Sequence, residues 1–131
     1  MEAEQSDTVT LIVPATTAHL RLARLIASGV ASLSDLDFDT IEDLRIAVDE
    51  LCAVLLEQAR PQAHLRLRYR VREGSTVEVE GDVDAGRDGA PDVPELTRQI
   101  LSAVIDRYDI GAEGGRLTFS LARSLSPANT A

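Results

Sequence analysis

The 131-residue chain has no tryptophan, a single cysteine, and only 3% aromatic residues. Its core must therefore be built mainly from aliphatic side chains. One cysteine, Cys52, excludes an internal disulfide and suits a reducing compartment. No apolar run approaches the ~20 residues of a membrane span, and the acidic opening MEAEQSD lacks the features of a signal peptide. We therefore expect a cytoplasmic protein that does not enter a membrane.

Basic residues are also scarce. The chain has 13 Lys and Arg against 22 Asp and Glu, which gives a formal net charge of −9. Nucleic-acid binding needs clustered basic residues, so we expect no nucleic-acid partner and favour a partner that is at least locally basic. The length fits one domain, and a hydrophobic content of 44% is that of an ordinary globular protein.

Hydrophobic periodicity predicts seven elements in the order β-α-α-β-β-α-β. The expected strands are 8–15, 64–72, 76–83 and 116–125, and the expected helices are 18–32, 41–59 and 95–108. An amphipathic antiparallel hairpin implies a sheet with one face toward helices and one toward water. The predicted fold is a two-layer α/β sandwich, with a mainly antiparallel sheet of four or more strands and three helices on one face.

Local signals suggest where these elements begin and end. Thr16 or Thr17 is a plausible N-cap of the first helix, and Asp39, followed by Glu42, of the second. The stretch Gly81–Pro94 is rich in Gly, Asp and Pro and predicts a flexible loop. The apolar residues of the first helix recur at helical spacing: Leu22, Leu25, Ile26 and Val30.

The runs HLRLRYRVR and TVEVEGDV alternate strictly between apolar and polar residues. A hairpin with a three-residue loop would place basic residues opposite acidic ones, each opposite pair contributing roughly 0.2–1 kcal/mol. The expected pairs are Arg72 with Thr76, Arg70 with Glu78, Arg68 with Glu80, and Arg66 with Asp82. The basic row is then either a nucleic-acid patch or the solvated, internally neutralised face of a half-exposed sheet, and we favour the second interpretation.

The stretch IEDLRIAVDELCAVLLEQA predicts a helix that is apolar on almost every side. The stripe expected to pack on the sheet is Ile41, Leu44, Val48, Leu51, Cys52 and Leu55. The opposite side carries Ile46, Ala47, Ala53, Val54, Glu50 and Glu57. A solvated helix face is seldom this apolar, so we expect that side to be covered or to line a cleft. Glu50 is then either a solvent-facing residue or a carboxylate held for a purpose.

Other chemical signals are weak. Cys52 lies in the core stripe and is expected to be a small buried hydrophobe. His19 and His64 have no partner at metal-ligand spacing, so no metal site is expected. The run DVDAGRDG lacks the glycine position and the closing Glu of a calcium loop.

The stretch LDFDTIEDLRIAVDELC, in a chain of this length and element order, resembles the bacterial anti-sigma factors of the RsbW and SpoIIAB type. These are small members of the GHKL, or histidine-kinase-like ATPase, superfamily, and the resemblance is greatest to the actinobacterial branch that controls sporulation- or stress-type sigma factors. It covers residues 8–123 and is strongest in the second helix. It implies a single histidine-kinase-like ATPase domain at 8–125, with flexible tails at 1–7 and 126–131.

The resemblance also implies a nucleotide site with altered residues. In the family, a Glu on the second helix is the general base and an Asn four residues later holds Mg²⁺; these positions are Glu50 and Val54 here. Val54 offers no oxygen, so Glu50 is expected to be a remnant of the catalytic box. Asp84 and Gly86 fall at the adenine-binding Asp-x-Gly box after a one-residue adjustment. Residues 95–98, ELTR, replace the phosphate-binding glycines. We expect no required cofactor, no bound Mg²⁺, and at most weak ATP or ADP binding.

By the same resemblance, the chain would bind and sequester an alternative sigma factor and be released by a STAS-type anti-anti-sigma protein. Arg24 on the first helix aligns with an Arg on the shared docking surface, and a homodimer is implied through the first strand and helix. One alternative is an active ATP-dependent serine/threonine kinase acting on the antagonist, against which Val54, Glu95 and Thr97 argue. Another is a domain of this fold without a sigma partner, such as a dimeric interaction module.

Overall fold

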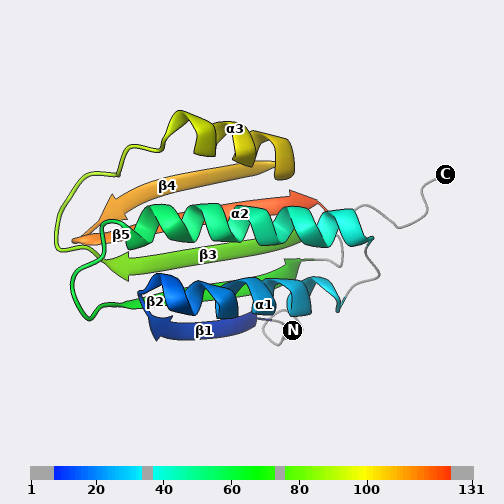
Figure 1. The fold of residues 1–131 in the computed structure, drawn as a ribbon, viewed down its shortest axis with the longest axis horizontal. Helices are drawn as coiled ribbons and strands as arrows, with labels where there is room; N and C mark the ends of the chain where they lie inside the picture. Colours follow the sequence, from blue (N-terminus) through cyan, green and yellow to red (C-terminus); the bar gives the residue numbers. More distant parts are fainter. Residues whose placement is uncertain (1–7, 34–36, 73–75, 125–131) are drawn as a thin grey trace.

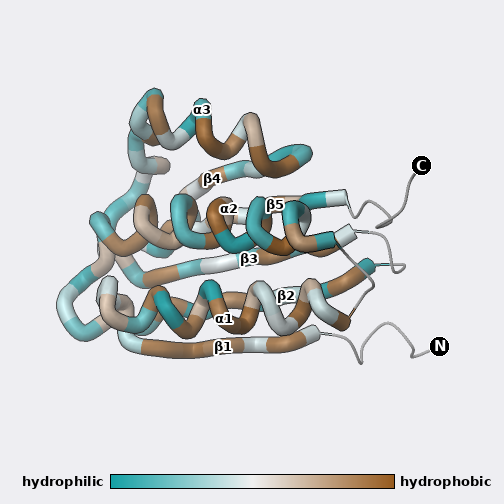
Figure 2. The backbone as a smooth tube through the Cα atoms, turned by 45° about the vertical axis from the view of Figure 1, so that its right-hand side comes forward, coloured by the Kyte–Doolittle hydropathy of each residue, from teal (hydrophilic) through white to brown (hydrophobic). Residues whose placement is uncertain are grey.

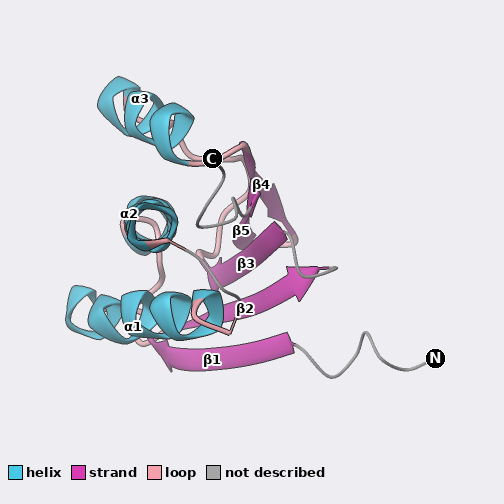
Figure 3. Cartoon of the chain, turned by 90° about the vertical axis from the view of Figure 1, so that its right-hand side faces the viewer, coloured by secondary structure: helices cyan, strands magenta, loops and turns pink. Residues whose placement is uncertain are grey.

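The computed structural model describes residues 8–33, 37–72 and 76–124. These residues form a five-stranded antiparallel sheet with three α-helices on one face, in two layers (Figures 1 and 3). The predicted two-layer α/β sandwich is therefore confirmed. The elements are β1 (Thr8–Pro14), a short 3₁₀ turn η2 (Thr17–His19), α1 (Leu20–Ala31), α2 (Phe38–Leu56), β2 (His64–Arg72), β3 (Thr76–Asp84), α3 (Glu95–Val104), β4 (Arg107–Glu113) and β5 (Arg116–Ser124).

The strands lie in the order β1-β2-β3-β5-β4, so β1 and β4 are the edges of the sheet. The predicted register of the β2–β3 hairpin is confirmed, with Arg66 opposite Asp82 and Arg72 opposite Thr76. Between β4 and β5 the chain turns at Gly114 and Gly115, whose φ angles are +62° and +82°. Left-handed conformations at both positions of a two-residue hairpin turn favour glycine.

The face of α1 that enters the core differs from the predicted one. Ala23 and Ala27 are at most 1% exposed, whereas Leu22 and Leu25 are 41% and 63% exposed. Small side chains at four-residue spacing let α1 lie close to the sheet and to α2. The buried Tyr69 hydroxyl of β2 donates a 2.9 Å hydrogen bond to the Ala23 carbonyl and ties the helix to the sheet.

The predicted stripe of α2 does pack on the sheet: Leu44, Val48, Leu51, Cys52 and Leu55 are at most 1% exposed. The predicted N-cap was wrong. Asp37 is the cap, with extended backbone, and its Oδ1 accepts a 2.8 Å hydrogen bond from the Thr40 amide. Asp39 already lies in the first turn, where a side chain cannot reach the free amides as an N-cap does. The predicted Thr16 or Thr17 cap of the first helix is also not formed: α1 begins after His19 without a side-chain cap, and the Thr16 hydroxyl bonds His19 Nδ1.

Two boundaries in the second half of the chain also differ from prediction. The expected loop Gly81–Pro94 begins later, because β3 continues to Asp84 through its pairing with β5. The expected helix 95–108 ends at Val104, and the chain re-enters the sheet as β4, which was not predicted. None of the helices in the described ranges is long and apolar enough to cross a membrane.

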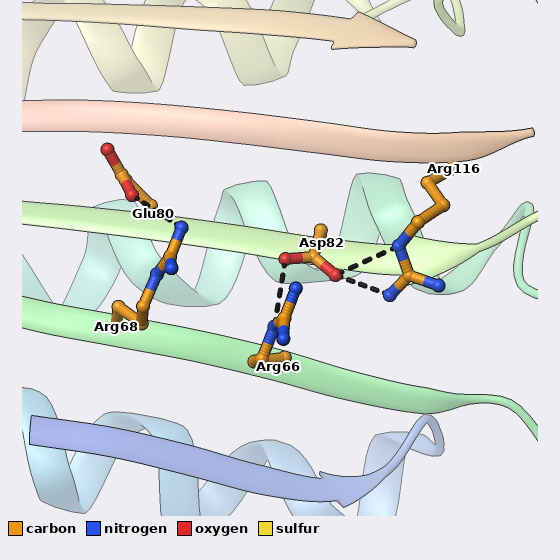
Figure 4. A network of polar contacts seen from close by, with 5 residues as sticks. All are labelled: Arg66, Arg68, Glu80, Asp82 and Arg116. Atoms are coloured by element: carbon orange, nitrogen blue, oxygen red, sulfur yellow. Dashed lines mark hydrogen bonds and ion pairs between the residues drawn. The ribbon is translucent and has the colours of Figure 1, made fainter. Parts of the chain in front are cut away.

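The solvent-facing side of the sheet carries a network of ion pairs (Figure 4). Asp82 of β3 lies between Arg66 of β2, at 3.3 Å, and Arg116 of β5, whose Nε is 3.2 Å away. Arg68 pairs with Glu80 at 3.0 Å. Glu78, predicted to pair with Arg70, pairs instead with Arg72 at 3.1 Å. Three of the four arginines of β2 are thus paired with acidic residues of β3, which supports the internally neutralised face over a nucleic-acid patch.

A candidate functional site beside the second helix

A small cleft lies between α2 and the segment that leads into α3. Its volume is about 70 Å³, and its lining residues are Glu50, Ala53, Val54, Glu57, Gln58, Pro91, Asp92, Pro94 and Thr97. The structure therefore brings Thr97 of α3 together with Glu50 and Val54 of α2, which sequence reasoning had already linked to each other. Pockets for small-molecule ligands commonly span roughly 300–1,000 Å³, so the cleft as it stands is too small for a nucleotide.

The second side of α2 divides into two zones. Ala47 is fully buried and Val54 is 8% exposed, while Ile46 remains 39% exposed. The prediction that this side is covered or lines a cleft therefore holds for Ala47 and Val54, but it was wrong for Ile46, which is exposed. Two consecutive residues of α2 have different neighbours: Asp49 bonds Arg24 of α1, whereas Glu50 lines the cleft.

The electrostatics of the cleft disfavour a polyphosphate. Glu50, Glu57 and Asp92 line it, and none of the described lining residues is basic. Glu95, at the start of α3, accepts a hydrogen bond from Arg98, which lowers the pKa of the Glu95 carboxyl and keeps it charged. A phosphate group placed among the lining residues would meet several carboxylates, while Arg87 and Arg98 lie outside the lining, where they bond Gln58 and Glu95.

The residues present do not fit a magnesium–nucleotide complex. Mg²⁺ requires oxygen ligands in near-octahedral geometry, and Val54, one turn after Glu50 on α2, supplies none. Within the described parts of the chain, no three His, Cys, Asp or Glu side chains are placed to hold a metal ion. We therefore derive no catalytic step through ATP or Mg²⁺ at this cleft.

Asp84 and Gly86 lie apart from the cleft lining. In β3 the odd-numbered residues are buried, and Asp84 shares the alternation of Asp82, which faces solvent. Asp84 Oδ1 accepts a 3.1 Å hydrogen bond from the Gly86 amide, and Gly86 has a φ of +65°. The carboxylate thus stabilises its own turn, and the assignment of Asp84 to adenine stays a prediction.

Arg24 is not an isolated helix arginine. Its Nη1 lies 2.6 Å from Asp49 Oδ1, and the two side chains are 35% and 39% exposed. Sequence reasoning gave Asp49 no partner, because the contact depends on how α1 and α2 pack. The exposed apolar residues nearest in sequence to the pair are Leu22, Leu25 and Ile46. This pair, with those three residues, is called the α1–α2 surface below.

The architecture defines a class of protein. Residues 13–118 match the family model described as "Histidine kinase-like ATPase domain". The chain also superposes on the crystal structure of the RsbU and RsbW domains of Rv1364c from Mycobacterium tuberculosis with a TM-score of 0.74. That match covers 96% of this chain and 35% of the other at 14% identity, and it shows the fold alone. The chain belongs to the histidine kinase-like ATPase family.

Within that family, the sequence groups with RsbW. It is 40% identical over 111 residues to the serine-protein kinase RsbW of Bacillus velezensis. The aligned residues cover 82% of this chain and 69% of that protein. It is 42% identical over 69 residues to the anti-sigma-F factor RsbW of Mycobacterium tuberculosis, where the match covers 53% of this chain and 41% of the relative. This is an RsbW-type protein, whose match spans less than half the length of the mycobacterial relative.

Proposed function

We propose that the chain is an anti-sigma factor that acts by binding: it sequesters an alternative sigma factor until a STAS-type anti-anti-sigma protein displaces it. The observation that carries the proposal is Val54, which lies beside Glu50 in the cleft and presents only methyl groups where a metal ligand would be needed. The relative named anti-sigma-F factor supports the same role.

The chemistry of phosphoryl transfer supports binding over catalysis. Transfer from ATP depends on cations that neutralise charge on the phosphates. The cleft offers Glu50, Glu57 and Asp92 instead, and the glycines of the phosphate loop are replaced by residues 95–98. A nucleotide is accordingly not required for the proposed function.

The α1–α2 surface is the proposed docking surface for the sigma factor and its antagonist. Arginine is enriched in binding hot spots, and Leu25 and Ile46, 63% and 39% exposed, add apolar surface of the kind found at interaction sites. Asp49 holds the Arg24 guanidinium at 2.6 Å, which reduces the side-chain freedom that binding would otherwise remove.

The chain is further proposed to form a homodimer through β1 and α1. β1 is an edge strand that is hydrophobic along most of its length (Figure 2), and Ile12 is 58% exposed. Edge strands of this kind are a liability unless they are paired or covered. Light scattering at micromolar concentration should give the mass of a dimer, and a clean monomer would contradict this part of the proposal.

The second candidate is an active serine/threonine kinase that phosphorylates the antagonist. It is favoured by the name of the Bacillus velezensis relative, a serine-protein kinase. Affinity purification of the tagged chain from its native cytoplasm tests the first candidate, and the expected partner is a sigma factor. Recovery of a STAS-type protein that becomes phosphorylated when Mg²⁺-ATP is added would establish the kinase instead. Recovery of neither would refute both.

A further inference from the structure

The segment that follows β3 is fastened to the end of α2 by two arginines. Arg87 donates a side-chain hydrogen bond to Gln58 Oε1. The Arg60 amide donates a 2.9 Å hydrogen bond to the carbonyl of Asp84. Gln58 also lines the cleft, so the first of these contacts lies at the cleft's edge.

The Arg60 side chain adds a packing contact. Its Cδ is 2.8 Å, and its Nε and Nη1 are 3.2 Å, from the position that a Cβ at Gly86 would take. Arg60 therefore lies directly across the backbone of Gly86. The stem of an arginine covers such a surface well while its charged end stays in water.

The same segment is held from its other side by the turn between β4 and β5. The amides of Ala85 and Gly86 both donate 2.9 Å hydrogen bonds to the Gly115 carbonyl. Residues 84–87 are thus held between the end of α2 and the last hairpin by contacts within the chain.

We propose that Arg60 and Arg87 form a built-in clasp that keeps residues 84–87 on the end of α2 without a nucleotide. The inference rests on the proposed function in one respect, that no nucleotide is required. Its consequence is that the closed arrangement at this end of the cleft is the resting state of the chain. A ligand that entered would have to break these contacts first.

Hydrogen exchange of the full-length chain tests the clasp, with protection factors corrected for intrinsic rates. The double variant Arg60→Ala/Arg87→Ala removes the Arg87–Gln58 hydrogen bond and the packing of the Arg60 side chain on Gly86, but keeps the bond from the Arg60 amide to Asp84. The Ala85 and Gly86 amides, which bond Gly115, should then exchange about three- to tenfold faster, because the segment that carries them opens more readily. Arg21→Ala, which removes another exposed arginine, from α1, is the control and should leave these amides unchanged. Gln58→Glu should slow their exchange, because a charge-assisted bond to Arg87 is stronger.

Adding ATP at 1 mM, with and without Mg²⁺, should not change the exchange of this segment in the unaltered chain. The clasp is refuted if the double variant behaves like Arg21→Ala, or if ATP protects the segment in the unaltered chain. Neither exchange result changes what is expected from copurification of a sigma factor. Conversely, failure to recover a sigma factor would leave the exchange test of the clasp unaffected. The two proposals therefore fail separately.

Discussion

Arg24 of α1 and Asp49 of α2 form an ion pair, with Nη1 and Oδ1 2.6 Å apart, and it joins the two helices at the α1–α2 surface. Asp49 is the neighbour of Glu50, so α2 turns one carboxylate toward the α1–α2 surface and the next toward the cleft. Both members of the pair are about a third exposed, so water screens their attraction. The pair orients Arg24 more than it stabilises the fold.

Replacing Arg24 should weaken partner binding with little effect on folding. Arg24→Glu places two carboxylates together, so we expect at least a tenfold loss of affinity for the sigma factor or its antagonist. An exposed pair contributes at most about 1 kcal/mol, so Arg24→Ala should lower the thermal midpoint by only about 3 °C. Isothermal calorimetry and thermal melts measure the two effects, with Arg21→Ala as the control. Unchanged affinity of the Glu variant for both partners would exclude Arg24 from the surface.

Nucleotide titration should show no Mg²⁺-dependent tightening of ATP binding. Loss of a metal–phosphate contact usually costs more than the ~1.4 kcal/mol that changes affinity tenfold. Weak, metal-independent ADP or ATP binding is compatible with this expectation. Calorimetry with and without Mg²⁺, on the unaltered chain and on Val54→Asn, makes the measurement. Micromolar, Mg²⁺-dependent binding by the unaltered chain would show that another residue supplies the metal ligand.

Tyr69→Phe should destabilise the fold by about 1 kcal/mol, because it removes the buried hydrogen bond to the Ala23 carbonyl at 2.9 Å. Burial also raises the pKa of the Tyr69 hydroxyl, which therefore stays protonated and can donate throughout the physiological range. Tyr108→Phe on β4 is the matched control, since that side chain is only half-buried. Equal urea midpoints for the two variants would mean that the hydrogen bond contributes nothing.

The Asp37 cap should make stability depend on pH in the acid range. The hydrogen bonds from Thr40 lower the pKa of Asp37 in the folded chain. The stabilisation is therefore present above the unfolded pKa of about 3.9 and is lost as the pH falls through the lower, folded pKa. Asp37→Ala should reduce the denaturant midpoint at pH 7 and lose that deficit once the pH falls below the folded pKa of Asp37. Asp39→Ala should lower the denaturant midpoint at pH 7 by less than Asp37→Ala does. A larger loss in Asp39→Ala would instead identify Asp39 as the cap.

Several features could be predicted from sequence because their causes are local or strictly periodic. The β2–β3 register follows from a period of two and a short connection, since a slip by one residue would turn Leu67 and Val79 out of the core. The stripe of α2 follows from the helical period, and the cleft was anticipated because Val54 and Glu50 share the other side of that helix.

β4 could not be predicted in the same way. Leu101, Ile105 and Tyr108 continue the helical spacing of α3, so the local pattern favours a longer helix. Pairing with β5 across the Gly114–Gly115 turn overrides that preference and draws 107–113 into the sheet. The need for glycine at position 81 also depends on β5 and could not be predicted locally. A side chain there would overlap the ring of Phe119 on that neighbouring strand.

The sequence by itself determined the two layers, the charge-paired face of the sheet and the apolar second side of α2, because each depends on the spacing of residues along one segment. Tertiary structure alone decided that Arg24 meets Asp49 and that Arg60 crosses Gly86. These contacts join elements whose separation in sequence carries no periodic signal. They are set by the angles and distances at which the close-packed core allows helices and strands to meet.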